Sequence, residues 1–433
     1  MRPLSRMALT ILALLAAAAA GYATWRANER AAGLDFYIYY ANAQLAGRDD
    51  IANIYDRDTQ MRVGEELYAR AAAGKSELRR FDANRRRFLD SVSSPFLYTA
   101  LSWVSRDYDR ALWQYHVLVF AAFIGGFVLF ARAVRVSWPS LLFLLATLLL
   151  WYRGFEADFR VGNVNSLQLM MLGLAVWCPP LVAGVIAGML IAFKPNLILI
   201  PLLLGIARIA ARDWRRLRFE LLGGAIGVAI AIIAAALRYG SFEIWLQWIA
   251  RANEFYHRLP TRAERNSTPL LALFQEHGAW VSYVAALAFT IVAAIAIARG
   301  KSQNDELIIG VAILIYLLSA TVVWLHYMVL VIPAALALLR WRWTAGIALL
   351  ALAAIAEEPF ELITRTAVYP NDAKLIAPAL FALFACALWK LGTPPSRRLS
   401  GERLAPATEE TAARRRLLSR RDAGVPQQPS RPA

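Results

Sequence analysis

Residues 181–207 read LVAGVIAGMLIAFKPNLILIPLLLGIA, and this stretch decides how the chain is organised. Lys194 is its one charged side chain, and Pro195 follows directly. Proline breaks a helix and leaves carbonyl groups without donors. A single long helix here would also place the DWRRLR cluster at 213–218 outside the membrane and invert every later segment. We therefore predict two helices, 181–193 and 195–207.

The composition of the whole chain agrees with a lipid environment. Of its 433 residues, 59% are hydrophobic, and the mean hydropathy is +0.44. Soluble domains contain roughly 45–50% apolar residues, so most soluble classes are excluded. The net charge of +16 does not by itself indicate a nucleic-acid partner, because in a membrane protein the placement of charges matters more than their sum.

Ten more apolar runs lie outside the opening stretch. They fall near 7–25, 111–131, 138–152, 164–178, 221–237, 278–298, 306–323, 327–339, 343–356 and 375–391. A spanning helix needs ~20 apolar residues, and several runs are shorter. We predict an all-α polytopic membrane protein with about twelve transmembrane helices, or ten to twelve if some are re-entrant. We interpret the first run as an uncleaved anchor, with a cleaved signal peptide as the alternative.

The basic residues predict the orientation. With the N-terminus inside, the even-numbered connections hold most of the arginine clusters, as the positive-inside rule requires. Residues 1–392 then form one transmembrane domain with two large outer loops, 26–108 and 239–277. Short amphipathic helices are expected in the first loop, within 62–74 and 77–92. Residues 393–433 are basic and aperiodic, which predicts a disordered cytoplasmic tail.

One candidate site lies just beyond the first span, in GLDFYIYYAN at 33–42. Asp35 is a carboxylate where the outer leaflet meets water, and aromatic neighbours such as Tyr39 and Tyr40 can lower the local dielectric and stack on sugar faces. The alternative is an interfacial aromatic belt with an incidental Asp.

Further candidates follow at the outer ends of later runs. Arg160, Asn163 and Asn165 suit a phosphate or sugar-hydroxyl pocket, with ion pairs of Arg153 to Glu156 or Asp158 to Arg160 as the alternative. Lys194, within apolar sequence, needs an anion or a path to water, the alternative being snorkelling. His326 lies at the outer end of a helix pair, where a structural hydrogen-bonded role is the alternative.

Several other chemistries find no support in the sequence. Cys178 and Cys386 have no Cys-x-x-Cys spacing, so neither a metal cage nor a redox pair is indicated. The other histidines lack zinc-site spacing, and no Walker loop, GxSxG elbow or GxGxxG motif is present. A group of acids in the first loop could bind a hard divalent ion or be surface charge: Asp49, Asp50, Asp56 and Asp58.

Taken in order along the chain, these polar motifs resemble those of glycosyltransferase family 87, a group of polyprenyl-phosphate-sugar-dependent membrane transferases. The matching pieces are DFYIYYANAQLAGRDD with IYD at 54–56, SSPFLYTALSW at 93–103, GNVNSLQLMMLGLAVW at 162–177, AGVIAGMLIAFKPNLILIPLLL at 183–204, NST at 266–268 and LSATVVWLHYMVLVIPA at 318–334. They cover roughly residues 5 to 390.

The resemblance implies a C-type glycosyltransferase (GT-C) bundle and an inverting transfer of a hexose, with mannose the first candidate, to a lipid- or glycan-linked acceptor. Asp35 is the expected base. Lys194, His326 and Arg160 are expected to bind the donor phosphate. Sugar or acceptor contacts are expected from Tyr39, Tyr40, Trp324, Asn163, Asn165 and Asn266. No cofactor is implied, since the lipid-linked donor is a substrate; a divalent metal stays open, and no nucleic acid is involved.

The same resemblance implies a bacterial inner membrane with the active site facing the periplasm. The chain departs from the family pattern at three places. Asn163 stands where Gln is common, Asn266-Ser267-Thr268 replaces Asn-Gln-Ser, and Ala320 lies near the position of a usual Pro. These departures bear on the acceptor and the pocket geometry. Two other functions remain as alternatives: a flippase or transporter of a lipid-linked or amphipathic substrate, and an assembly subunit without activity.

Overall fold

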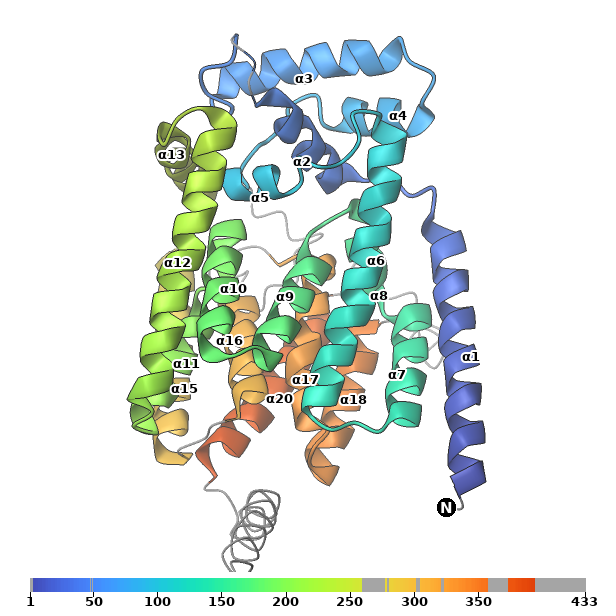
Figure 1. Ribbon diagram of the computed structural model, residues 1–433, viewed down its shortest axis with the longest axis vertical. Coiled ribbons are helices and arrows are strands. Elements are labelled where there is room, and N and C mark those ends of the chain that lie inside the picture. Colours follow the sequence, from blue (N-terminus) through green and yellow to red (C-terminus); the bar gives the residue numbers. More distant parts are fainter. Residues whose placement is uncertain are drawn as a thin grey trace, which may run out of the picture.

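The computed structural model describes residues 3–46, 48, 50–258, 277–278, 280–300, 304–320, 323–356 and 373–393. Within these ranges every regular element is an α- or 3-10 helix. The predicted all-α class is therefore confirmed for the described part of the chain. Most of the helices run alongside one another in a bundle, and a group of short helices covers one of its ends (Figure 1).

The cap on the bundle comes from the predicted first outer loop. After α1 (Pro3–Asn28), the chain forms α2 (Leu34–Leu45), α3 (Arg57–Ala72), α4 (Glu77–Arg85) and α5 (Pro95–Ala100). Three of these starts have side-chain caps: Asp56 accepts from the Thr59 amide at 2.8 Å, Ser76 from the Arg79 amide at 3.0 Å and Ser94 from the Leu97 amide at 3.2 Å. The expected amphipathic helices are present, although α4 ends at Arg85 rather than near 92.

Each predicted apolar run coincides with helical structure. After α1, the bundle contains α6 (Tyr108–Ala133), α7 (Trp138–Trp151), α8 (Arg153–Val161), α9 (Asn165–Trp177), α10 (Pro180–Phe193), α11 (Leu199–Ala210), α12 (Trp214–Tyr239), α15 (Trp280–Gly300), α16 (Asp305–Ser319), α17 (Ile332–Leu338), α18 (Arg342–Ala356) and α20 (Ala373–Gly392). α13 (Glu243–Arg258) lies beside the cap (Figure 1).

Helix length supports a membrane protein but not the count of about twelve spans. Among the described helices, four are long and apolar enough to cross a bilayer alone: α1 from Met7, α6, α12 and α15. α7 and α8 meet at a bend of 61° and would together form a fifth. The other apolar helices are shorter than a bilayer requires.

The predicted break at Lys194 is confirmed. α10 ends at Phe193, Lys194 has extended backbone angles, and a 3-10 turn, η1 (Pro195–Leu197), leads into α11. Because Pro195 has no amide hydrogen and restricts the residue before it, the helix cannot continue through this point. The break leaves the Lys194 side chain in the interior of the bundle instead of on a continuous helix surface.

α10 and α12 pack with their backbones in close approach. A Cβ atom built on Gly188 would lie 2.2 Å from the carbonyl oxygen of Gly224, and one on Gly227 would lie 2.2 Å from that of Val185. Small residues at four-residue spacing allow membrane helices to approach in this way. This contact fixes α12 against the helix that ends at Lys194.

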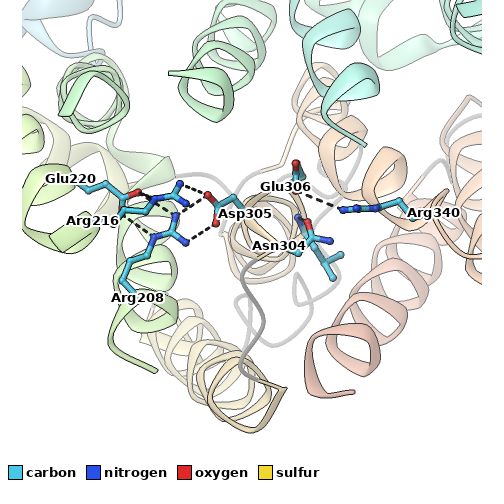
Figure 2. A network of polar contacts seen from close by, with 8 residues as sticks. Arg208, Arg216, Glu220, Asn304, Asp305, Glu306 and Arg340 are labelled. Carbon is cyan, nitrogen blue, oxygen red and sulfur yellow. Dashed lines mark hydrogen bonds and ion pairs between the residues drawn. The ribbon is translucent and has the colours of Figure 1, made fainter. Parts of the chain in front are cut away.

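A buried charge network holds the ends of three helices together on the side away from the cap. Arg208 of α11 is 2% exposed and binds Asp305 of α16 through Nη1 and Nη2, at 2.7 and 2.8 Å. It also binds Glu220 of α12 at 3.2 Å through two nitrogens. Arg216 joins both acids, and Figure 2 shows the four side chains converging. Two of the predicted inner arginines are thus used in ion pairs within the protein.

Candidate functional site

Asp35 lies in the first turn of α2, which is the first helix of the cap. Its backbone position is fixed by Asp82 of α4, whose Oδ2 accepts from the Gly33 amide at 3.2 Å and also from the Tyr108 hydroxyl. The rest of α2 is buried against the cap and α6. The Asp35 side chain keeps 20% of its surface exposed, so it borders open space at the end of an otherwise buried helix.

Both carboxylate oxygens of Asp35 accept hydrogen bonds from distant parts of the chain. Oδ1 accepts from Nη2 of Arg86 at 2.8 Å, and Oδ2 accepts from Nδ2 of Asn163 at 2.7 Å. Arg86 also donates from Nε to the Leu34 carbonyl at 3.2 Å. These contacts orient the carboxylate and hold α2 against both α4 and the turn before α9.

Asn163 connects Asp35 to two further candidates. Its Nδ2 lies 3.2 Å from Nε2 of His326, and its Oδ1 accepts from Nζ of Lys194 at 3.4 Å. Because Nδ2 is a donor, Nε2 of a neutral His326 is the acceptor, which leaves the ring proton on Nδ1. The Lys194 ammonium also lies 4.5 Å from the centre of the Tyr327 ring. Asn165 also donates to Oδ1 of Asn163, at 3.2 Å. Five of the predicted residues therefore belong to one hydrogen-bonded group.

The turn that presents Asn163 depends on a glycine. Gly162 ends α8 with φ of +68°, and a Cβ atom there would lie 2.6 Å from Cβ of Phe36. A left-handed backbone and a neighbour this close both favour glycine. The turn can therefore pack directly on the residue after Asp35, which brings Asn163 within hydrogen-bond distance of the carboxylate.

Asp158 holds the other side of this turn. It is fully buried and accepts from both the amide and the side chain of Asn165 and of Ser166, at 2.6 to 3.3 Å. Asn165 also donates to the His326 carbonyl at 3.1 Å. The expected ion pair of Asp158 with Arg160 is therefore not formed.

Arg160 and Trp324 are not part of this hydrogen-bonded group. Arg160 is 57% exposed and pairs with Glu156 at 3.3 Å, and Arg153 forms the predicted pair with the same acid at 3.2 Å. Trp324 is 38% exposed near His326. Asn266 lies outside the described residues. Arg160 has a counterion at the surface and does not join the hydrogen bonds around Asp35.

Tyr39 and Tyr40 are buried in the core, 5% and 4% exposed. Tyr40 packs against Phe36 and Tyr108 and donates its hydroxyl to the Arg106 carbonyl. Neither ring has a free face, so the expected stacking on a sugar does not fit their positions. Their packing instead fixes α2, and burial raises the pKa of both phenols.

Three residues of the site had no assigned role in the sequence. Arg86 is one of three consecutive arginines, Asp158 is one of two acids in its turn, and Tyr115 donates to the Asn163 carbonyl at 2.8 Å from within α6. A charged residue in a predicted turn was a usable signal for Asp158. Only the fold shows which of the three consecutive arginines, 85 to 87, reaches Asp35.

Of the acids considered for a metal, Asp50 and Asp56 have partners in the protein, and Asp58 is exposed on α3. Arg48 and Arg62 bind Asp50 and hold the pKa of that carboxyl well below its usual range. Asp56 caps α3, and Asp49 is outside the described ranges. No group of three or more potential ligands that could hold a metal ion occurs within the described part of the chain.

The cap places two further carboxylates near Arg86: Asp82, which is fully buried, and Asp90, which is 33% exposed. Burial raises the pKa of Asp82 to about 6, while the Tyr108 hydroxyl, the Gly33 amide and Arg86 oppose this shift. Burial also raises the pKa of Asp90, with Arg251 and Arg86 opposing. Asp90 accepts from Arg251 at 3.3 Å. Both of these acids have their own hydrogen-bond donors, so Asp35 is the carboxylate that binds Arg86 directly.

Comparison with known proteins gives one match. The model of glycosyltransferase family 87 matches residues 92–325, more than half of the chain. The matched range contains Asn163 and Lys194, begins after Asp35 and Arg86, and ends one residue before His326. No curated protein and no solved structure matches the chain.

Proposed function

The chain belongs to glycosyltransferase family 87, and we propose that it moves a hexose, with mannose as the first candidate, from a polyprenyl-phosphate sugar to a lipid- or glycan-linked acceptor. The family makes it a glycosyltransferase. The donor, the sugar and the acceptor are our proposal, as is the site of reaction at the periplasmic face of a bacterial inner membrane.

One observation carries the proposal: Asn163 joins Asp35 to both Lys194 and His326 at hydrogen-bond distances of 2.7 to 3.4 Å. Transfer from a phosphate donor needs a base at the acceptor and a cation or donor at the leaving group. The chain brings these groups together from four separate segments. A structural role alone would not need a carboxylate that keeps 20% of its surface exposed.

In the proposed reaction Asp35 takes the proton of the acceptor hydroxyl. The acceptor oxygen forms a bond to C1 of the sugar while the bond from C1 to the phosphate oxygen breaks, so the configuration at C1 inverts. Lys194, and His326 through its Nδ1 hydrogen, stabilise the negative charge that develops on the phosphate. Asn163 orients the carboxylate, and Asn165 holds the His326 backbone.

We further propose that the shorter helices of the bundle also cross the membrane in groups, as the basic inner connections predict. The cap of α2 to α5 then faces the periplasm, and the network around Arg208 faces the cytoplasm.

The test is sugar transfer from a panel of polyprenyl-phosphate sugars by membranes that contain the wild type, Asp35→Asn or Asp58→Asn. Asparagine keeps the shape of Asp35 but cannot take the proton, so transfer should be lost while the thermal unfolding temperature stays near that of the wild type. Asp58 is an exposed acid on α3, and its variant should transfer normally.

Normal transfer by Asp35→Asn would refute its role as base. If the folded wild type uses no donor of the panel, the assay is repeated as lipid flipping in reconstituted vesicles. Flipping without transfer would favour the transporter function instead.

A further inference from the structure

Arg86 is the one cation that contacts the Asp35 carboxylate within the described part of the chain. Nη2 lies 2.8 Å from Oδ1, and the two side chains are 28% and 20% exposed. The pair therefore borders the same open space that a substrate must enter. In the proposed reaction Asp35 loses its negative charge when it takes the acceptor proton, so the ion pair with Arg86 changes during turnover.

The charges of the proposed reaction indicate how it changes. The donor is a phosphodiester with one negative charge, and Asp35 carries another. When the acceptor proton moves to Asp35 and the electron pair of the broken C1–O bond goes to the phosphate oxygen, Asp35 becomes neutral and the lipid phosphate becomes a dianion. One negative charge has thus moved from the partner of Arg86 to the phosphate.

We propose that Arg86 is a phosphate-binding residue, which exchanges Asp35 for the lipid phosphate and with Lys194 binds the departing dianion. This inference rests on the proposed function and deepens it. A planar guanidinium with two parallel donors matches phosphate oxygens better than any other side chain. Arg153 and Arg160, the other arginines near the turn, already pair with Glu156.

The cap allows this exchange through side-chain movement alone. Arg86 directly follows α4, which ends at Arg85, and Asp82 anchors that helix through the Gly33 amide. The other carboxylates near Arg86 are Asp82 and Asp90, which accept hydrogen bonds from Tyr108 and Arg251 respectively. The guanidinium is therefore held by Asp35 and by the Leu34 carbonyl, and both contacts are only partly buried.

The experiment measures the binding of undecaprenyl phosphate to the purified full-length protein in detergent, with undecaprenol as the uncharged control ligand. We expect Arg86→Gln to weaken binding of the phosphate roughly 10- to 100-fold, the loss expected when a hydrogen bond to a charged group is removed. Arg86→Lys should recover part of the loss. Arg80→Gln, an exposed arginine of the same helix, should bind as the wild type does.

Three results would overturn the proposal. Equal binding of undecaprenyl phosphate by the wild type and both Arg86 variants would show that the residue does not touch phosphate. A change confined to the pH profile of transfer, with binding unchanged, would make Arg86 only a positioning residue for Asp35. Equal losses for undecaprenol and its phosphate would indicate a general disturbance of the structure and not the loss of a phosphate contact.

The proposed function can fail separately. A wild type that binds undecaprenyl phosphate but transfers no sugar refutes the transferase assignment and leaves the Arg86 comparison intact. If Arg86→Gln does not fold, as judged by its unfolding temperature, the comparison of Arg86→Lys with the wild type decides the question, because lysine keeps the charge but loses the paired donors.

Discussion

Asn163 should raise the rate of sugar transfer through its hydrogen bond to Asp35. Its Nδ2 donates to the carboxylate at 2.7 Å, and a hydrogen bond to a charged group contributes about 2 kcal/mol. Asn163→Ala removes this bond together with the link to Lys194. If the bond is kept in the transition state, kcat/KM should fall roughly 30-fold.

Asn163→Asp should have a larger effect of another kind. It places an oxygen where Nδ2 now lies, 2.7 Å from Oδ2 of Asp35. Two carboxylates this close cannot both ionise and will share a proton, so the base is lost near neutral pH. Activity should return in part as the pH is raised.

The assay is the initial rate of sugar transfer against donor concentration between pH 5 and 9, with Asn84→Asp as the control. Asn84 is exposed on α4, so its variant has the same charge change without the contact. A wild-type rate for Asn163→Asp at pH 7 would refute the assignment of Asp35 as base. An equal rate loss for Asn84→Asp would show that the net charge of the outer face is responsible.

Three further predictions concern stability, measured by thermal unfolding in detergent. Asp305→Ala leaves the buried Arg208 without one of its two acids and should cost about 3–5 kcal/mol; a loss below about 1 kcal/mol would contradict the network. Burial raises the pKa of Asp82 to about 6 from 3.8, so the folded state holds a proton that the unfolded state has lost. Stability from this group should fall by about 2 kcal/mol as the pH rises from 4 to 6, and an equal pH dependence in Asp82→Asn would disprove this. Gly188→Ala should destabilise by about 1–3 kcal/mol because its Cβ meets a carbonyl oxygen, whereas Gly346→Ala, with nothing within 4 Å, should not.

The order of the polar motifs along the chain predicts most of the site without the fold. Asp35 follows the first span, Lys194 interrupts an apolar run, and His326 ends one. Each is a polar residue where a membrane helix meets water, and such residues are costly unless they are used. Their selection therefore needed only local sequence and the resemblance to the family.

Other parts of the site depend on packing between segments far apart. Asn163 and Asp35 are 128 residues apart, and their contact requires the left-handed Gly162 against Phe36. Arg86 has the same chemistry as its two neighbours, and only the end of α4 decides which of the three reaches the carboxylate. The burial of Tyr40 likewise follows from its packing on Tyr108.

The sequence by itself determined that this chain is helical, that it belongs in a membrane and that a helix ends at Lys194. These properties follow from hydropathy and backbone chemistry, which act over a few neighbouring residues. The tertiary structure alone decided which polar groups meet. A hydrogen bond between Asp35 and Asn163 exists only where two separately formed segments bring its donor and acceptor atoms within about 3 Å of each other.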